Sequence, residues 1–125
     1  MPTNIKIIRT QDFIRAKTDG VLDLAASRNL LKELAAESKA TGIYCLLVDT
    51  RGAEARLSAV DRYELGVLTA AELPQVRAKV GLLVPPQEQV DARFFETVSR
   101  NRGADLRAFT DFETAITWLI LEEQP

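Results

Sequence analysis

Residues 43–49 read IYCLLVD, an apolar run that ends in an acidic residue. An uninterrupted run of this kind is typical of a strand in the middle of a sheet, where helices cover both faces. The chain continues as TRGAEARLSAVDRYEL over residues 50–65, which predicts a polar loop with two arginines and then a helix that begins at Ser58. The segment therefore predicts a central strand that leads through a loop into a helix.

Two short β-rich segments precede this strand, NIKIIRT at residues 4–10 and DFIRAKT at residues 12–18. In the second segment polar and apolar side chains alternate, as expected of a strand with one solvated face or of a sheet edge. Asp19 and Gly20 predict a turn after it. We therefore expect the chain to open with a hairpin.

After the hairpin, helical and strand patterns alternate to the end of the chain. Helices are expected over residues 23–40, 58–73, 91–102 and 110–121, and further strands over residues 76–84 and 105–109. Residues that commonly cap helix N-termini stand at the predicted starts: Asp23, Ser58 with Asp61, and Thr110 with Glu113. Residues that commonly end helices stand at the predicted stops: Gly42, Pro74 and Gly103. This order predicts a single α/β domain over residues 1–125, with a mixed, mostly parallel five-stranded sheet and about four helices.

The composition argues against several classes of partner. Sixteen basic and eighteen acidic residues leave a net charge of −2, whereas nucleic acids and anionic membranes require a concentrated excess of Lys and Arg. No apolar run approaches the roughly 20 residues of a membrane span. The single cysteine, Cys45, lies within an apolar run, so we expect a buried, unreactive thiol and a cytoplasmic protein without disulfides.

The side chains that most enzymes use are missing. The sequence has no histidine, which excludes Ser-His-Asp and Cys-His relays and the usual zinc sites, and it has no glycine-rich phosphate loop. Asp12 stands alone where a phosphoacceptor domain of the response-regulator kind would carry an acidic pair. We therefore expect no metal, cofactor or catalytic residue, and an enzyme that acts through carboxylates is the least favoured alternative.

Ser58 and the residues before it form a candidate anion or phosphorylation site. Asp49, Thr50 and Arg51 are expected at the carboxyl end of a central strand, where α/β sheets usually bind ligands. A phosphate on Ser58 could pair with Arg51 and Arg56. The alternative is that Ser58 only caps its helix, which is the commoner role of a serine in this position.

Four segments together resemble the SpoIIAA-like branch of the STAS (anti-sigma-factor antagonist) family. They are NIKIIRTQDFIRAKTDGVLDL, LLVDTRGAEARLSAVD, NRGADLRAF and FTDFETAITWLI, and the similarity runs through nearly the whole chain. The resemblance implies a sheet of four or five strands with helices, and binding of partner proteins or small ligands. In the best-known members the serine at the start of the helix after the central strand is phosphorylated, within an Asp-Ser-Ser-Gly-like string. Here that position reads Leu57-Ser58-Ala59, which favours the cap.

Two further groups of residues are candidate contact surfaces. Gly66 lies inside the second helix, where it allows a backbone or a ligand to approach closely, and Tyr63, Val67 and Leu68 near it could line a pocket or pack in the core. On the last helix the apolar stripe leaves out Trp118 and Leu121, which therefore either anchor an interface or lie against a neighbouring segment.

These observations leave two main interpretations. The first is a regulatory domain that binds a protein partner and forms a homodimer. The second is a domain that holds a small apolar or anionic molecule between the second helix and the sheet, as implied by the similarity between SpoIIAA-like domains and lipid carriers of the CRAL-TRIO type.

Overall fold

The computed structural model describes residues 4–10, 12–74 and 77–121. Its strands are β1 (Asn4–Arg9), β2 (Ile14–Leu22), β3 (Cys45–Ala55), β4 (Lys79–Leu83) and β5 (Asp105–Phe109). Its α-helices are α1 (Leu24–Thr41), α2 (Ala59–Glu72), α3 (Gln89–Asn101) and α4 (Phe112–Ile116). A 3-10 turn, η2 (Pro86–Glu88), leads into α3, and a π-helical turn, η3 (Thr117–Leu121), follows α4. The predicted fold class, a mixed five-stranded sheet with four helices, is confirmed.

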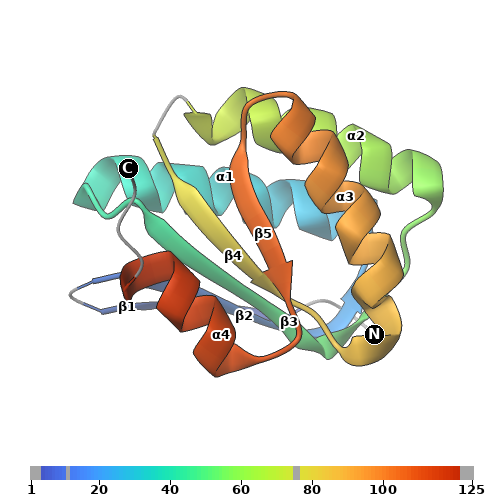
Figure 1. Ribbon diagram of the computed structural model, residues 1–125, viewed down its shortest axis with the longest axis horizontal. Coiled ribbons are helices and arrows are strands. Elements are labelled where there is room, and N and C mark those ends of the chain that lie inside the picture. The colour runs from blue at the N-terminus through green and yellow to red at the C-terminus, as the bar shows by residue number, and fades with distance from the viewer. Residues whose placement is uncertain (1–3, 11, 75–76, 122–125) are drawn as a thin grey trace.

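The strands lie in the sheet in chain order, β1-β2-β3-β4-β5, so β3 is the central strand as predicted. β1 pairs antiparallel with β2, and the other three pairs are parallel. Right-handed crossovers that always step in the same direction across a sheet place their helices on the same face. Accordingly α1, α2 and α3 cover one face, and α4 folds back onto the other (Figure 1).

Local capping explains where most helices begin and end. Asp23 accepts a hydrogen bond from the Ala26 amide at the start of α1, and Gly42, at φ 74°, closes that helix in the left-handed conformation. The expected Thr110 cap is wrong. Asp111 caps α4 instead, because its carboxylate accepts hydrogen bonds from both the amide and the hydroxyl of Thr114.

The turn expected at Asp19 and Gly20 is also wrong, because β2 runs through both residues to Leu22. Gly20 does have a positive φ of 79°, but it lies beside a shift in the register between β2 and β3. A local irregularity of this kind accommodates the left-handed residue inside the strand, so the glycine signal marks a bend and not an end.

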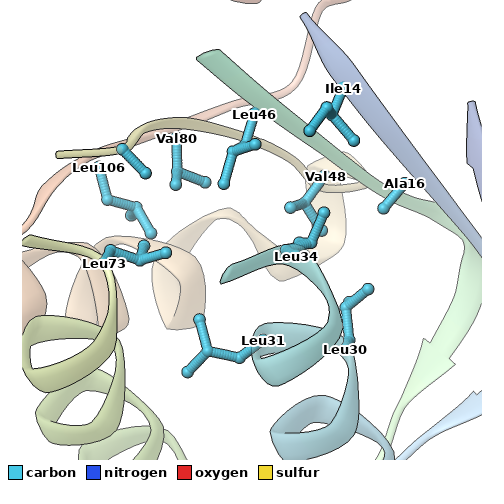
Figure 2. Close-up of a cluster of buried hydrophobic side chains, with 11 residues drawn as sticks. Ile14, Ala16, Leu30, Leu31, Leu34, Leu46, Val48, Leu73, Val80 and Leu106 are labelled. Atoms are coloured by element: carbon cyan, nitrogen blue, oxygen red, sulfur yellow. The ribbon is translucent and has the colours of Figure 1, made fainter. Parts of the chain in front are cut away.

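Each face of the sheet has its own apolar cluster. On the side of α1, α2 and α3, side chains such as Leu46 and Val80 from the strands face Leu30 and Leu31 of α1 across the layer (Figure 2). On the side of α4 the cluster is smaller and combines strand and helix side chains: Leu47, Leu83, Ala115, Trp118 and Leu119.

Candidate functional site

The segment after Asp49 is not a loop, contrary to the prediction. β3 pairs with β4 only as far as Asp49 and Leu83, but it continues beside β2 until Ala55. Neighbouring side chains in a strand point to opposite faces of the sheet. The residues that were expected to converge in a loop are therefore distributed between two faces.

Thr50 lies on the face covered by α1, α2 and α3, where its hydroxyl donates a hydrogen bond of 2.7 Å to the carbonyl of Leu83. Asp49 and Arg51 lie on the face of α4, together with Arg15, whose guanidinium is 5.4 Å from the ring centre of Phe112. The structure thus brings Asp49 and Arg51 together and places Thr50 on the other side.

Asp49 is a buried carboxylate, with only 2% of its surface exposed, and it is held by two arginines. Arg51 donates one hydrogen bond to this carboxylate from its backbone amide, at 3.1 Å, and two from its guanidinium, one to each oxygen at 3.0 Å. Arg15 donates a fourth hydrogen bond from its guanidinium, at 3.3 Å. Burial alone would raise the pKa of Asp49, but the hydrogen bonds from Arg51 outweigh it and hold that pKa below its usual value. The carboxylate is thus charged and already paired, which indicates a structural role.

Ser58 is exposed at the N-terminus of α2 and forms a reciprocal capping box with Asp61. Its hydroxyl accepts from the Asp61 amide and the Asp61 carboxylate accepts from the Ser58 amide, both at 3.0 Å. Arg56 pairs with Glu54 at 3.4 Å on the surface. Within the described part of the chain, no hydrogen bond or ion pair joins Ser58 to Arg51 or Arg56, and their pairing with a phosphate on Ser58 stays a prediction.

The four residues expected to line a pocket have different environments. An added Cβ on Gly66 would lie 2.5 Å from Cγ1 of Val98, so this glycine lets α3 pack directly against α2. Leu68 packs against the core cluster. Tyr63 and Val67 are 45% and 38% exposed on the outside of α2. The close approach predicted at Gly66 is that of a neighbouring helix.

A cavity of about 140 Å³ does lie between the helices α1, α2 and α3 and the sheet. None of the four expected pocket residues is among its described lining residues. Its walls are mainly aliphatic and include Leu30, Leu31 and Leu34 from α1, Val48, Ala53 and Ala55 from β3, Val80 and Leu82 from β4, and Ala92 and Phe95 from α3. Near the end of β3, Ala53 and Ala55 contribute only small side chains to this lining.

One end of the cavity lies at the carboxyl ends of β2, β3 and β4, where polar residues line it. There Arg62 of α2 donates to the carbonyl of Leu57 and pairs with Glu88 at 3.1 Å and with Asp91 at 3.5 Å. The Asp91 side chain is 55% exposed, so this end reaches the surface. We call Arg62, Glu88 and Asp91 the mouth cluster; it links α2 to the start of α3.

Ser27, in the first turn of α1, also lines the cavity. Its hydroxyl oxygen is buried and has no hydrogen-bond partner among the described residues. Buried polar atoms are nearly always partnered, so an unpaired hydroxyl in an apolar cavity calls for an explanation. The sequence analysis identified neither Ser27 nor the mouth cluster. Alternating small residues at 53 and 55 were the one signal in the sequence that pointed to this space.

The face of α4 carries a second hollow of about 360 Å³, which is more polar and is lined by Arg107, Phe109, Asp111, Glu113, Thr114, Thr117 and Trp118. Trp118 is only 6% exposed, so it lies against neighbouring segments and does not project as a free anchor within this chain. Its ring centre lies 5.6 Å from that of Phe109 and 4.3 Å from the Lys79 ammonium. The Lys79 ammonium also donates a hydrogen bond of 2.6 Å to the Trp118 carbonyl. The projection that placed Trp118 off the core assumed a regular α-helix, whereas residues 117–121 form a π-turn. The side chain of Leu121 lies outside the described ones.

Cys45 is half-buried, not fully buried as predicted, and it packs against the apolar cluster of the α4 face. Burial raises the pKa of its thiol, which lies 3.5 Å from the Leu119 carbonyl. Nowhere in residues 4–10, 12–74 and 77–121 do three or more potential metal-binding side chains come together. The helices of those residues also lack the length and apolar character that a membrane span requires.

No protein-family model and no curated protein matches this chain. Among solved structures, an anti-sigma factor antagonist from Mycobacterium paratuberculosis aligns with a TM-score of 0.66 and 12% identity over 94% of both chains. An uncharacterized DUF3478-family protein with a SpoIIAA-like fold from Shewanella loihica PV-4 aligns with a TM-score of 0.55 and 23% identity, over 94% of this chain and 93% of that chain. The phosphorylated form of the Bacillus cell fate determinant SpoIIAA aligns with a TM-score of 0.55 and 17% identity, over 92% of this chain and 98% of that chain.

These alignments cover 92–94% of this chain, and their TM-scores of 0.55–0.66 show a shared fold. They agree with the resemblance found in the sequence. The chain has the SpoIIAA-like fold.

Proposed function

We propose that this chain is a non-catalytic binding domain that holds a small apolar molecule in the cavity between the sheet and the helices α1, α2 and α3. The observation that carries the proposal is the cavity itself, about 140 Å³ in volume, mainly aliphatic, and open at the carboxyl ends of the strands. Ligand sites in parallel sheets usually lie at these ends. Apolar cavities of about this size bind molecules the size of benzene in other proteins.

Native mass spectrometry of freshly purified protein tests the proposal, because one spectrum reports both the oligomeric state and any retained molecule. We expect a small uncharged molecule to be retained, or to be taken up when toluene is added. Ala92→Leu places a larger side chain into the cavity from α3 and should prevent uptake. Ala25→Leu adds the same side chain on the exposed surface of α1 and should leave uptake unchanged. Equal uptake by both variants would contradict the proposal.

A second function, regulation through a protein partner, is supported by the surface of α2. Ser58 is exposed at its N-terminus, and Val60, Tyr63 and Val67 form an exposed apolar stripe along the same helix. Proteins of the same fold include anti-sigma factor antagonists, one of them in a phosphorylated form. A partner protein would cover this stripe, and a phosphate on Ser58 would add negative charge at its edge.

Incubation with kinases from the host, followed by mass spectrometry, tests the regulatory function. We expect a phosphate on Ser58 that is absent from Ser58→Ala. Persistent absence of phosphate in the unmodified protein would remove Ser58 from the proposal. Light scattering tests homodimerisation separately, with Val60→Asp as the variant that disrupts the stripe.

A further inference from the structure

We infer that the ligand of the cavity is uncharged and carries one hydroxyl or carbonyl group, and that Ser27 binds this group. The inference rests on the proposed function, because it names the chemistry of the molecule that the cavity would hold. It follows from three features of the lining, which are its size, the unpaired hydroxyl and the charges at the mouth.

The size of the cavity limits the ligand to one ring or a short chain. A volume of about 140 Å³ is close to that of an engineered cavity that accepts benzene. Aliphatic side chains from α1, β3, β4 and α3 surround this space, so most of the ligand surface must be apolar.

Ser27 supplies the hydrogen-bonding group. Thr50 and Thr69 also bring hydroxyls to the lining, but that of Thr50 already donates to the Leu83 carbonyl at 2.7 Å, and Thr69 is not among the described buried groups without a partner. The buried Ser27 oxygen has no partner among the described residues, and leaving such a group unpaired costs free energy. A ligand hydroxyl or carbonyl that reaches Ser27 removes this cost, and a purely apolar ligand does not.

The mouth cluster argues against an anionic ligand. It contains one positive and two negative side chains, and the guanidinium of Arg62 is already engaged by Glu88, Asp91 and the Leu57 carbonyl. A carboxylate or phosphate would meet the two acidic groups before it met a free donor. Of the apolar and anionic ligands considered from the sequence, the structure favours the uncharged, apolar one.

Three probes of one ring size test the inference, which are toluene, benzyl alcohol and benzoate, titrated into the full ¹⁵N-labelled chain and followed by NMR. We expect both uncharged probes to shift amides around the cavity and benzoate to shift none at the same concentrations. In Ser27→Ala, the affinity for benzyl alcohol relative to toluene should fall by roughly five-fold, the value of one hydrogen bond.

Two control variants separate the role of Ser27 from general effects. Ser27→Thr keeps the hydroxyl and should keep the relative affinity for benzyl alcohol. Ser99→Ala removes a buried serine hydroxyl of α3 that bonds to the Phe95 carbonyl, outside the cavity lining, and should not change the ratio.

Each failure has a distinct meaning. If neither toluene nor benzyl alcohol binds, the proposed function is overturned together with this inference. If both bind and Ser27→Ala leaves their ratio unchanged, Ser27 is not the anchor, although the apolar site stands. If benzoate binds as tightly as benzyl alcohol, the requirement for an uncharged ligand is wrong.

Discussion

The two faces of the central strand β3 are built differently. On the side of α4, Leu47 is fully buried and the next inward residue, Asp49, is tied to Arg51 and Arg15. On the side of α1, α2 and α3, Val48 and Thr50 line a cavity that continues past Ala53. On one face β3 therefore carries a buried carboxylate paired with two arginines, and on the other face it lines an apolar cavity.

This difference indicates how the fold combines stability with binding. Dense packing and paired buried charges define one arrangement of a face, whereas a dry cavity leaves side chains without partner atoms and lowers stability until it is filled. We therefore expect the α4 face to carry the larger share of stability per residue. Five predictions, ordered from the largest expected effect on stability to the smallest, test and sharpen this comparison.

Equivalent truncations on the two faces should differ in cost. Leu47→Ala removes a fully buried side chain from the α4 face and should lower the free energy of unfolding by about 3–4 kcal/mol. Leu31→Ala enlarges the existing cavity and should cost about 2 kcal/mol, since Leu31 has fewer partner atoms to lose. Denaturant unfolding measures both values. Equal costs would contradict the contrast, and toluene should stabilise only the Leu31 variant beyond its effect on the unmodified protein.

Asp49→Asn should lower the free energy of unfolding by about 2 kcal/mol at neutral pH, because it removes the charge that Arg51 and Arg15 hold. The matched control is Glu54→Gln, which breaks an exposed pair with Arg56 and should change stability by less than about 0.5 kcal/mol.

The same variant should change the pH dependence. The folded-state pKa of Asp49 is lowered, so its contribution is complete above the ordinary carboxyl pKa of about 4 and is lost as the pH falls through the folded-state value. Unfolding measured from pH 7 down to acid should therefore show the two proteins converging. A constant difference would mean that the charge of Asp49 is not responsible.

Gly66→Ala should destabilise the protein by about 1–2 kcal/mol. Alanine favours the helix by about 1 kcal/mol, but its Cβ would lie 2.5 Å from Cγ1 of Val98 and force α2 and α3 apart. Adding Val98→Ala should recover part of the loss, so the two substitutions should be non-additive in thermal unfolding. A stabilised Gly66→Ala would show that the helices are free to separate.

Ser58→Ala should cost about 1 kcal/mol through loss of the cap on α2, and Ser58→Asp should cost less, since aspartate also caps helices. Thermal unfolding of the two variants checks this. Neither substitution should alter toluene binding, because Ser58 is not among the residues that line the cavity. An effect of either variant on binding would connect the serine to the cavity after all.

Short-range patterns predicted most of the elements. The caps at Asp23 and Ser58 and the stop at Gly42 depend on hydrogen bonds between residues a few positions apart, so the local sequence carries them. The errors at Gly20 and Thr110 have a common origin. Each residue is of a type that favours the predicted turn or helix cap, but interactions of a neighbouring segment determined the structure that formed. For Gly20 these interactions were those of β3, and for the last helix they were those of Asp111.

The candidate site was less predictable, because its residues come from separate elements. Ser27 of α1, Arg62 of α2, and Glu88 and Asp91 at the start of α3 share no sequence motif, and only the crossover helices bring them to one end of the sheet. A cavity lies between the sheet and the helices, α2 among them, but its described lining includes none of the predicted pocket residues, and ligand binding there stays a prediction.

The sequence by itself determined the order of strands and helices and the central place of residues 45–49, since an apolar run is typical of a strand covered on both faces. The first two residues of the predicted run, Ile43 and Tyr44, lie outside β3, and Tyr44 is exposed. Tertiary structure decided how far that strand runs, because pairing with β2 keeps it extended until Ala55. This pairing alternates Asp49, Thr50 and Arg51 between the faces, and the register shift that follows Asp49 brings Ala53 and Ala55 to the same face as Thr50, where they line the cavity.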